Sequence, residues 1–281
     1  MPELPEVETI VRGLDGLLAA KVVAEVRVFY PGSFPDDPAL TATRLTGAVI
    51  RRVDRRGKAI LIYLDNSRVL MVHLKMTGQL IYYGQETASR ISELLPGRST
   101  RIAIHFIDGS VLYFNDQRKF GWMKLLAEEE LTRQPFLQKL GVEPLSGAFT
   151  AGHLEKLLNR RKGSSVKAAL LDQSIIAGIG NIYADESLFL SGIDPDRRCR
   201  DLTSEEVKRL HRAIRRVLRE SIKMGGSTRR NYRNAIGQTG DYLTKAWVYG
   251  RTGEACRKCG RPIMKKRTAG RGTHYCPGCQ S

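Results

Sequence analysis

The chain has 281 residues, which is enough for two domains and a smaller appendage. Its 46 Lys and Arg outnumber its 29 Asp and Glu and are spread along the chain, so the net charge of +17 favours a polyanionic partner such as nucleic acid. No apolar run approaches the ~20 residues of a membrane span, and the acidic start lacks the pattern of a signal peptide. We therefore expect a cytoplasmic protein without a membrane partner, with an anionic membrane surface as the alternative explanation of the charge.

The first ten residues, MPELPEVETI, offer a reactive group. Removal of Met1 before the small Pro2 would leave a secondary amine, and an α-amino group titrates at roughly pH 8, so part of it is nucleophilic at neutral pH. Its attack on an aldehyde-level carbon gives an iminium ion, the electron sink of Schiff-base catalysis. Glu3 and Glu6 lie beside this amine in the sequence and could each act as a general acid or base. The same residues also fit an ordinary helix start, with Pro and acidic residues in the first turn.

The N-terminal half predicts one helix followed by strands. Apolar residues from Val7 to Leu18 repeat at helical spacing, so a helix is expected to end near Ala20. Short segments rich in Val, Ile, Leu, Phe and Tyr then alternate with turns, which predicts an antiparallel sandwich. The predicted strands are 22–30, 49–53, 58–64, 68–74, 79–83, 101–107 and 110–114, and the stretches 31–38 and 85–99 are predicted loops.

The C-terminal half is predicted to be helical. Helices are expected at 150–161, 166–171 and 184–190, and Thr203 with Glu206 forms a capping box ahead of a further amphipathic helix. The long polar loop 225–239 has the length of a functional lid. The resulting α+β organisation has an N-terminal sandwich domain at 1–130, a linker at 131–150, a helical domain at 151–240 and a C-terminal module at 241–281.

Four cysteines near the C-terminus predict a metal site. Cys256 and Cys259 form one C-x-x-C pair, and Cys276 and Cys279 form the second after sixteen residues. This spacing suits a four-cysteine zinc ribbon, in which one Zn²⁺ has all four positions filled by protein and is structural. The basic stretch 265–271 is expected at the tip of the resulting hairpin. Cys199 has no partner in the sequence pattern.

These motifs at both ends resemble the formamidopyrimidine-DNA glycosylases, and further matches extend the resemblance over essentially the whole chain. The resemblance implies that Pro2 is the catalytic nucleophile, Glu3 its acid/base partner and Glu6 a second catalytic carboxylate. The Arg-Gly-Lys triplet ending at Lys58 resembles the active-site loop lysine of the family. Without the resemblance, Lys58 would be interpreted as an exposed hairpin residue.

The resemblance also implies a set of DNA contacts in each half of the chain. The stretch HLKMTG resembles the family segment in which Met76 fills the void left by an extruded base, with His73 on phosphate and Lys75 beside it. The stretch RKFG resembles the segment that pairs an arginine with the orphaned base and inserts a phenylalanine into the duplex. The stretch LLDQSIIAGIGN resembles the helix–two-turns–helix motif. The implied contacts in these last two segments and in the zinc finger are Arg118, Phe120, Lys167, Asn181 and Arg271.

The loop 225–242 matches the position of the family's lesion-capping loop. Its base-contacting part is expected at Thr228, Arg229, Arg230, Asn231 and Tyr232. The implied function is a bifunctional glycosylase and apurinic/apyrimidinic lyase, active as a monomer on oxidised purines in duplex DNA. Two alternatives stay open: an endonuclease VIII-type enzyme acting on oxidised pyrimidines, and a non-catalytic zinc-ribbon protein that binds nucleic acid.

Overall fold

The computed structural model describes residues 1–91, 94–228 and 232–281, and these residues form two compact units. The first unit comprises Met1–Gln138 and Gly225–Gly240, and the second comprises Lys139–Met224 and Asp241–Ser281. In the sequence, the segment 225–240 falls within the predicted helical domain at 151–240. In the structure it packs on the first unit, where Tyr232 is buried and the Tyr82 N–H donates to the Ala235 carbonyl at 2.8 Å.

Two antiparallel sheets build the first unit, as the strand pattern predicted. One sheet has the order β1-β6-β7-β5 and the other has the order β2-β3-β4-β8. The strands are β1 (Val23–Val28), β2 (Ile50–Arg56), β3 (Ala59–Leu64), β4 (Arg68–His73), β5 (Gly78–Tyr83), β6 (Thr100–Phe106), β7 (Val111–Asp116) and β8 (Trp122–Ala127).

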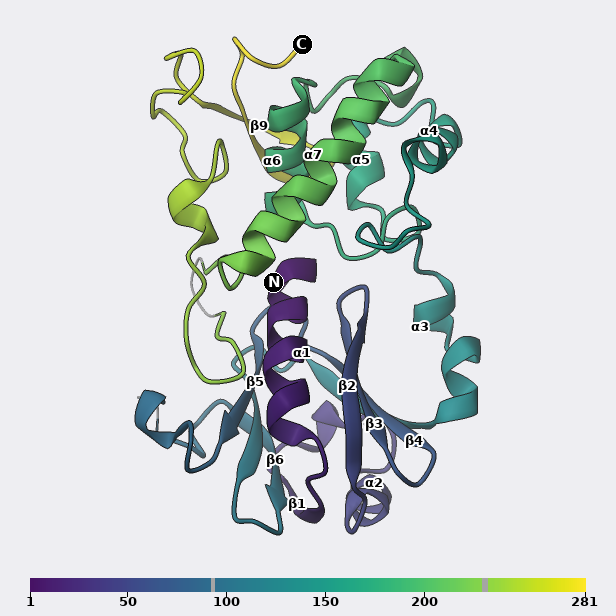
Figure 1. Cartoon of the computed structure of the whole chain (residues 1–281), viewed down its shortest axis with the longest axis vertical. Coiled ribbons are helices and arrows are strands. Elements are labelled where there is room, and N and C mark those ends of the chain that lie inside the picture. The colour runs from purple at the N-terminus through teal and green to yellow at the C-terminus, as the bar shows by residue number, and fades with distance from the viewer. Residues whose placement is uncertain (92–93, 229–231) are drawn as a thin grey trace. The chain divides into compact units, whose positions relative to one another are not determined.

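Helix α1 (Leu4–Leu18) closes one side of this sandwich. It lies between β5, at the edge of one sheet, and β2, at the edge of the other (Figure 1). Its apolar stripe is buried in the main core, as the spacing of Val7, Ile10 and Leu14 predicted. Because Glu3 caps this helix, burial of the stripe fixes where the amino terminus of the chain lies.

The second sheet of the sandwich is buried on both faces. Its outer face carries a separate apolar cluster that includes Leu61, Met71 and Leu131, with Phe136 of the short helix α3 (Pro135–Gln138) packed against it. This cover explains why β3 and β4 are nearly continuous apolar runs rather than alternating ones.

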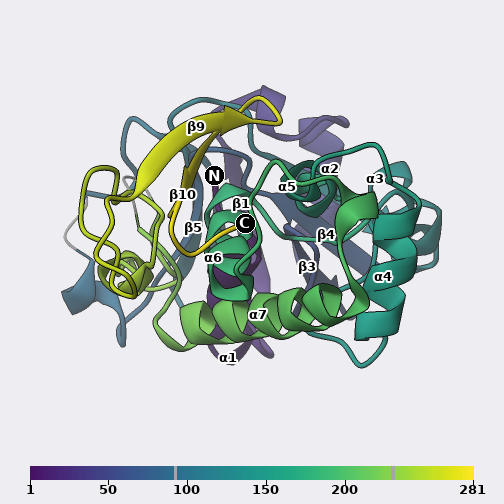
Figure 2. The same cartoon turned by 90° about the horizontal axis from the view of Figure 1, so that it is seen from above.

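The second unit is helical, as predicted. Its helices are α4 (Ala151–Asn159), α5 (Val166–Leu171), α6 (Asn181–Ser191) and α7 (Ser204–Lys223). Figure 2 shows α6 between α7 and the hairpin of β9 (Met264–Thr268) and β10 (Arg271–Tyr275). Among the described residues, no helix has both the length and the apolar character that crossing a membrane requires.

Helix α2 and strand β8 were not predicted from the sequence. Helix α2 (Pro38–Leu45) begins at the last residue of the predicted loop 31–38, although Asp37 caps it by accepting from the N–H groups of Ala39 and Leu40. Strand β8 mixes buried Met123 with half-buried neighbours, so its sequence lacks a clean alternation. Helix α2 was missed because it is short and largely exposed.

Candidate active site and metal centre

The carboxylate of Glu6 joins the amino terminus to the segment that follows α7. It is almost fully buried, and its Oε2 accepts the Glu3 N–H at 2.8 Å. Its Oε1 accepts the backbone N–H of Ser227 at 2.7 Å and the Ser227 hydroxyl at 2.9 Å. A Cβ on the neighbouring Gly226, whose φ is +87°, would lie only 3.0 Å from Glu6 Oε1. Glu6 therefore fixes Glu3 to the start of the segment 225–240, part of the predicted lesion-capping loop, which we call the capping segment.

Charged groups of both signs surround the chain's amino group. Burial lowers the pKa of the Met1 α-amino group below its usual value, the carboxylates of Glu3 and Glu6 oppose that effect, and the cations of Lys58 and Arg118 add to it. Lys58 is itself buried and follows Gly57, whose φ of +58° allows the turn between β2 and β3. The structure thus brings three of the predicted catalytic residues, Glu3, Glu6 and Lys58, around the amino terminus.

The three residues predicted to enter DNA come together at the surface of the same unit. Met76 lies in the loop between β4 and β5, and Arg118 and Phe120 lie in the loop between β7 and β8. The Arg118 guanidinium contacts the Met76 sulfur at 3.0 Å and lies 4.7 Å from the centre of the Phe120 ring. Met76 is 45% exposed and Phe120 is 52% exposed. Exposed apolar side chains next to a cation suit insertion into a base stack.

His73, at the end of β4, is held as a neutral ring. Its Nδ1 accepts the backbone N–H of Lys75 at 3.0 Å, so the proton of the neutral imidazole resides on Nε2. Burial, reinforced by the cations of Lys75 and Lys58, lowers the pKa of His73 to about 3. The ring stacks on Trp122 at 5.7 Å and meets Phe136 edge-on at 5.3 Å. Nothing in the sequence assigned a role to Trp122, because its partner His73 lies on a different strand.

The capping segment is closed at its base and packed along α1. The Thr228 N–H donates to the Gly240 carbonyl at 3.2 Å, and the Gly240 N–H donates to Thr228 Oγ1 at 2.7 Å. The Tyr232 hydroxyl donates to the Glu6 carbonyl at 3.4 Å, and burial raises the pKa of this phenol. Tyr232 is thus part of the core of the unit, whereas Arg229, Arg230 and Asn231 lie outside the described residues.

In the second unit, Lys167 lies inside the protein. Its side chain is fully buried, and its ammonium group donates to Asp185 Oδ1 and to Thr273 Oγ1, each at 2.6 Å. No sequence pattern marked Asp185, because its partner Lys167 lies on another helix. We call Lys167, Asp185, Thr273 and His274 the hairpin seat, since they join α5 and α6 to β10.

Asn181 and Arg271 lie at the edge of the hairpin seat. The Asn181 side-chain amide donates to the Gly272 carbonyl at 2.9 Å, and Lys167 reaches the same carbonyl at 3.4 Å. Arg271, the residue before it, is exposed. The three predicted phosphate contacts of this unit therefore meet around one backbone carbonyl, but only Arg271 presents its charge at the surface.

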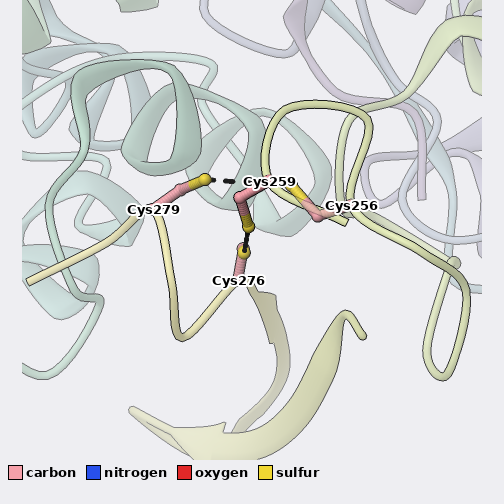
Figure 3. Close-up of side chains that lie close together, drawn as sticks. All are labelled: Cys256, Cys259, Cys276 and Cys279. Carbon is pink, nitrogen blue, oxygen red and sulfur yellow. Dashed lines mark hydrogen bonds between the residues drawn. The ribbon is translucent and has the colours of Figure 1, made fainter. Parts of the chain in front are cut away.

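The four cysteine sulfurs form one cluster (Figure 3). All four lie within 4.8 Å of one another, with Cys259 and Cys276 at 3.4 Å and Cys256 and Cys279 at 3.9 Å. Zn–S bonds of about 2.3 Å in a tetrahedron place sulfurs about 3.8 Å apart, so the cluster fits one zinc ion. Although burial opposes it, N–H groups of Lys258 and Cys259 help bring the pKa of the Cys256 thiol to about 7.

His274 is not a ligand in this cluster. Its backbone N–H donates to Asp185 Oδ2 at 2.9 Å, and its Nδ1 contacts the same oxygen at 3.3 Å. With four protein thiols the coordination sphere of zinc is complete, which is the mark of a structural site.

Comparisons with known proteins cover all parts of the chain. The formamidopyrimidine-DNA glycosylase N-terminal domain matches residues 1–123, and the H2TH domain of the same family matches 140–233. A zinc finger found in FPG and IleRS matches residues 253–281. This last match, together with the sulfur cluster, shows a zinc finger with a site for one ion.

Full-length relatives and solved structures agree with these matches. The formamidopyrimidine-DNA glycosylase of Geobacillus kaustophilus is 46% identical over 282 residues, covering 100% of both chains. That of Thermosynechococcus vestitus is 45% identical, covering 100% of this chain and 97% of the relative. The MutM (Fpg) protein from Thermus thermophilus aligns with a TM-score of 0.87 at 40% identity, covering 99% and 98% of the two chains. A Lactococcus lactis FPG variant in complex with DNA containing Fapy-dG aligns with a TM-score of 0.90 at 33% identity over 100% of both chains. The chain belongs to the formamidopyrimidine-DNA glycosylase family.

Proposed function

We propose that this protein is a bifunctional DNA glycosylase and apurinic/apyrimidinic lyase that excises oxidised purines, such as 8-oxoguanine and formamidopyrimidines, from duplex DNA. The observation behind this proposal is the grouping of Glu3, Glu6 and Lys58 around the amino terminus, in the unit that presents Met76, Arg118 and Phe120. A binding protein needs neither the buried carboxylates nor their placement at the amino terminus. The relatives that align with the whole chain are named formamidopyrimidine-DNA glycosylase, which agrees with the proposed activity.

The chemistry begins once Met1 has been removed and Pro2 has a free secondary amine. The Pro2 nitrogen attacks the C1′ carbon of the damaged nucleotide, the glycosidic bond breaks, and the base leaves with that electron pair and a proton. The Pro2 nitrogen loses its proton, and its lone pair then forms the C=N bond to C1′ while the C1′–O4′ bond breaks and O4′ takes up a proton from Glu3. The opened sugar is thus joined to Pro2 as an iminium ion, which acidifies the C2′ protons. Loss of such a proton expels the 3′ phosphate, and a second elimination expels the 5′ phosphate. The product is a one-nucleotide gap with phosphate at both ends.

Glu3 and Glu6 have different parts in this scheme. Glu3 transfers protons to and from the sugar and stabilises the cationic intermediate. Glu6 accepts the Glu3 N–H at 2.8 Å and the Ser227 N–H at 2.7 Å. It thereby fixes the position of the amino terminus, and so of Pro2, relative to the capping segment. Lys58 supplies positive charge for the sugar–phosphate at the lesion.

The exposed residues open the duplex. Met76 occupies the space that the extruded base leaves, Arg118 pairs with the orphaned base, and Phe120 enters the stack. Neutral His73 donates from Nε2 to a phosphate, with Lys75 beside it. Extrusion costs a few kcal/mol and least for a weakened pair, so damage itself contributes to selectivity.

The second unit binds the backbone around the lesion. Arg271 contacts phosphate directly, Asn181 contributes a polar contact beside it, and Lys167 supports both from inside the hairpin seat. By order along the chain, we propose a sandwich domain at 1–130, a linker at 131–150, a helical domain at 151–240 and the zinc finger at 241–281. The last part of the helical stretch, 225–240, packs on the sandwich unit. Within it we propose that residues 228–231 cap the lesion, while the buried Tyr232 anchors them. We expect a monomer that acts on DNA in the cytoplasm.

Excision of oxidised pyrimidines is a second candidate activity. The wild-type Lactococcus lactis Fpg, 32% identical over 100% of both chains, has been solved with DNA that contains an oxidised pyrimidine. A common site would serve both lesion classes, because the nucleophile attacks the sugar and not the base.

A panel of duplexes tests these assignments. Intact-mass measurement first establishes whether Met1 is absent. Strand cleavage is then compared on 8-oxoguanine opposite cytosine, on an oxidised pyrimidine and on undamaged DNA. Faster cleavage at 8-oxoguanine supports the proposal, and faster cleavage at the pyrimidine supports the second candidate. A retained Met1 with DNA binding but no cleavage of any lesion would leave a binding protein.

A further inference from the structure

The two loops that present Met76 and Phe120 are held by one buried carboxylate, that of Asp116. We call residues 74–77 and 117–121 the wedge loops. Asp116 ends β7, is fully buried, and pairs with Gly78 at the start of β5. It therefore lies where both wedge loops leave the sheet.

Each oxygen of this carboxylate accepts hydrogen bonds from the wedge loops. Oδ1 accepts from the Thr77 hydroxyl of the first loop and from the Arg118 N–H of the second, the latter at 3.1 Å. Oδ2 accepts the Gly121 N–H at 2.7 Å. The Thr77 oxygen in turn accepts the Arg118 N–H at 3.1 Å, so the two loops are also linked to each other.

Both wedge loops contain strained backbone directly before their apolar residue. Lys75 precedes Met76 with a φ of +49°, and Lys119 precedes Phe120 with a φ of +57°. A non-glycine residue in the left-handed region is strained and persists only where its surroundings impose it. Gly121 has no room for a side chain, because a Cβ would lie 2.7 Å from the Phe114 ring and 3.2 Å from Asp116 Oδ2.

We propose that Asp116 is a positioning residue that holds Met76, Arg118 and Phe120 in their DNA-opening arrangement before DNA is bound. This inference rests on the proposed function. The protein then does not have to order two loops when the base leaves the stack, and the cost of that ordering is met during folding. Asp116 itself touches no substrate atom in this scheme and acts through the wedge loops.

The test compares single hydroxyl deletions at the half-buried Thr77 and the buried Thr100. Thr77→Val removes the bond to Asp116, and Thr77→Ser restores it. Thr100→Val is the matched control, since the Thr100 hydroxyl donates to Asn115, the neighbour of Asp116 on β7, at 2.8 Å and contacts neither wedge loop. Asp116→Asn is the stronger change, and Thr77→Val keeps the test decisive if that variant does not fold.

Single-turnover excision from an 8-oxoguanine:cytosine duplex is measured beside strand cleavage at a preformed abasic site. We expect excision to fall about tenfold in Thr77→Val and about a hundredfold in Asp116→Asn, because small misplacements of positioning groups have effects of that size. Thr77→Ser and Thr100→Val should stay within about twofold of wild type. Cleavage at the abasic site should change less, since no base has to be extruded.

The outcomes separate the two proposals. Wild-type excision with equal rates in Thr77→Val and Thr100→Val would overturn the positioning role of Asp116 alone. Equal losses at the lesion and at the abasic site would also overturn it, because they would indicate general damage to the site. A wild type without excision would overturn the proposed function and this inference together.

Discussion

The amino-terminal site of the first unit and the hairpin seat of the second unit both bury charge, but they use it differently. Around the amino terminus, Glu3 and Glu6 lie with Lys58 beside a terminal amine, and the exposed Arg118 acts on the same group. In the hairpin seat, the ammonium of Lys167 is paired with Asp185 at 2.6 Å, and both side chains are wholly buried. The first arrangement leaves a reactive group among charges, and the second joins two helices to a zinc-finger hairpin. A lysine in a family motif can therefore serve either chemistry or architecture, and burial with its partners decides which.

The largest effect is expected at Glu3. Glu3→Gln keeps the shape of the side chain but removes its proton-transfer capacity, so excision should fall by roughly 10²–10⁴-fold. Thermal stability should change little, because the backbone bond from Glu3 to Glu6 remains. Single-turnover kinetics and a melting curve check both points. Unchanged excision kinetics in Glu3→Gln would show that Glu3, like the residues of the hairpin seat, has an architectural role and not a catalytic one.

At Lys167 we expect a loss of folding stability rather than a specific loss of catalysis. Lys167→Met removes one partner of a buried pair and should cost about 3–5 kcal/mol of folding stability, because Asp185 is left buried without its cation. Chemical denaturation measures this loss. Lys156→Met, a change on the exposed face of α4, serves as the control. A stable Lys167→Met protein that has lost only DNA affinity would contradict the architectural role.

His73 should make stability depend on pH. Its pKa is about 3 in the folded protein, whereas an unfolded histidine titrates near 6.5. Below pH 6.5 the unfolded chain therefore takes up a proton that the folded protein does not, and stability falls as pH falls from 6.5 towards 3. At pH 5 the loss is about 2 kcal/mol. His73→Gln should remove it, and His153→Gln on the exposed face of α4 should not. If the free energy of unfolding fell by the same amount in wild type and in His73→Gln between pH 7 and pH 5, the buried neutral state of the His73 ring would be contradicted.

The smallest effect is expected at Arg271. Its charge lies at the surface, so Arg271→Gln should leave folding unchanged and weaken binding to all duplexes alike. The slope of log affinity against log salt should decrease by about 1, the contribution of one phosphate contact. Titrations at several salt concentrations check this. An unchanged slope would mean that Arg271, like Lys167, serves the hairpin and not DNA.

The features that could be predicted from the sequence are those whose pattern lies within one short segment. The sandwich strands other than β8, together with α1 and α7, were predicted because patterned apolar residues reveal a buried face within one segment. The zinc cluster was predicted because each C-x-x-C pair fixes two ligands locally. Glu3 and Glu6 were singled out because they lie beside the Pro2 amine, and the resemblance to the family then assigned a role to each.

The contacts that the sequence did not reveal join distant segments. Lys167 and Thr273 meet although 106 positions separate them, and no pattern along the chain marks that pair. Asp116 is one acidic residue at a strand end, yet it gathers donors from two loops. Trp122 was not singled out in the sequence, yet its ring stacks on that of His73. Burial and pairing of this kind depend on tertiary structure, so only coordinates reveal them.

Borohydride trapping tests the central claim most directly, namely that Pro2 is the nucleophile. Protein and an 8-oxoguanine:cytosine duplex are mixed with borohydride, which reduces the iminium ion to a stable bond, and the adduct is mapped by peptide mass spectrometry. We predict one adduct, on residue 2, which is lost or strongly weakened in Pro2→Gly. An adduct on another residue, or none on any damaged duplex while DNA binding persists, would contradict the account.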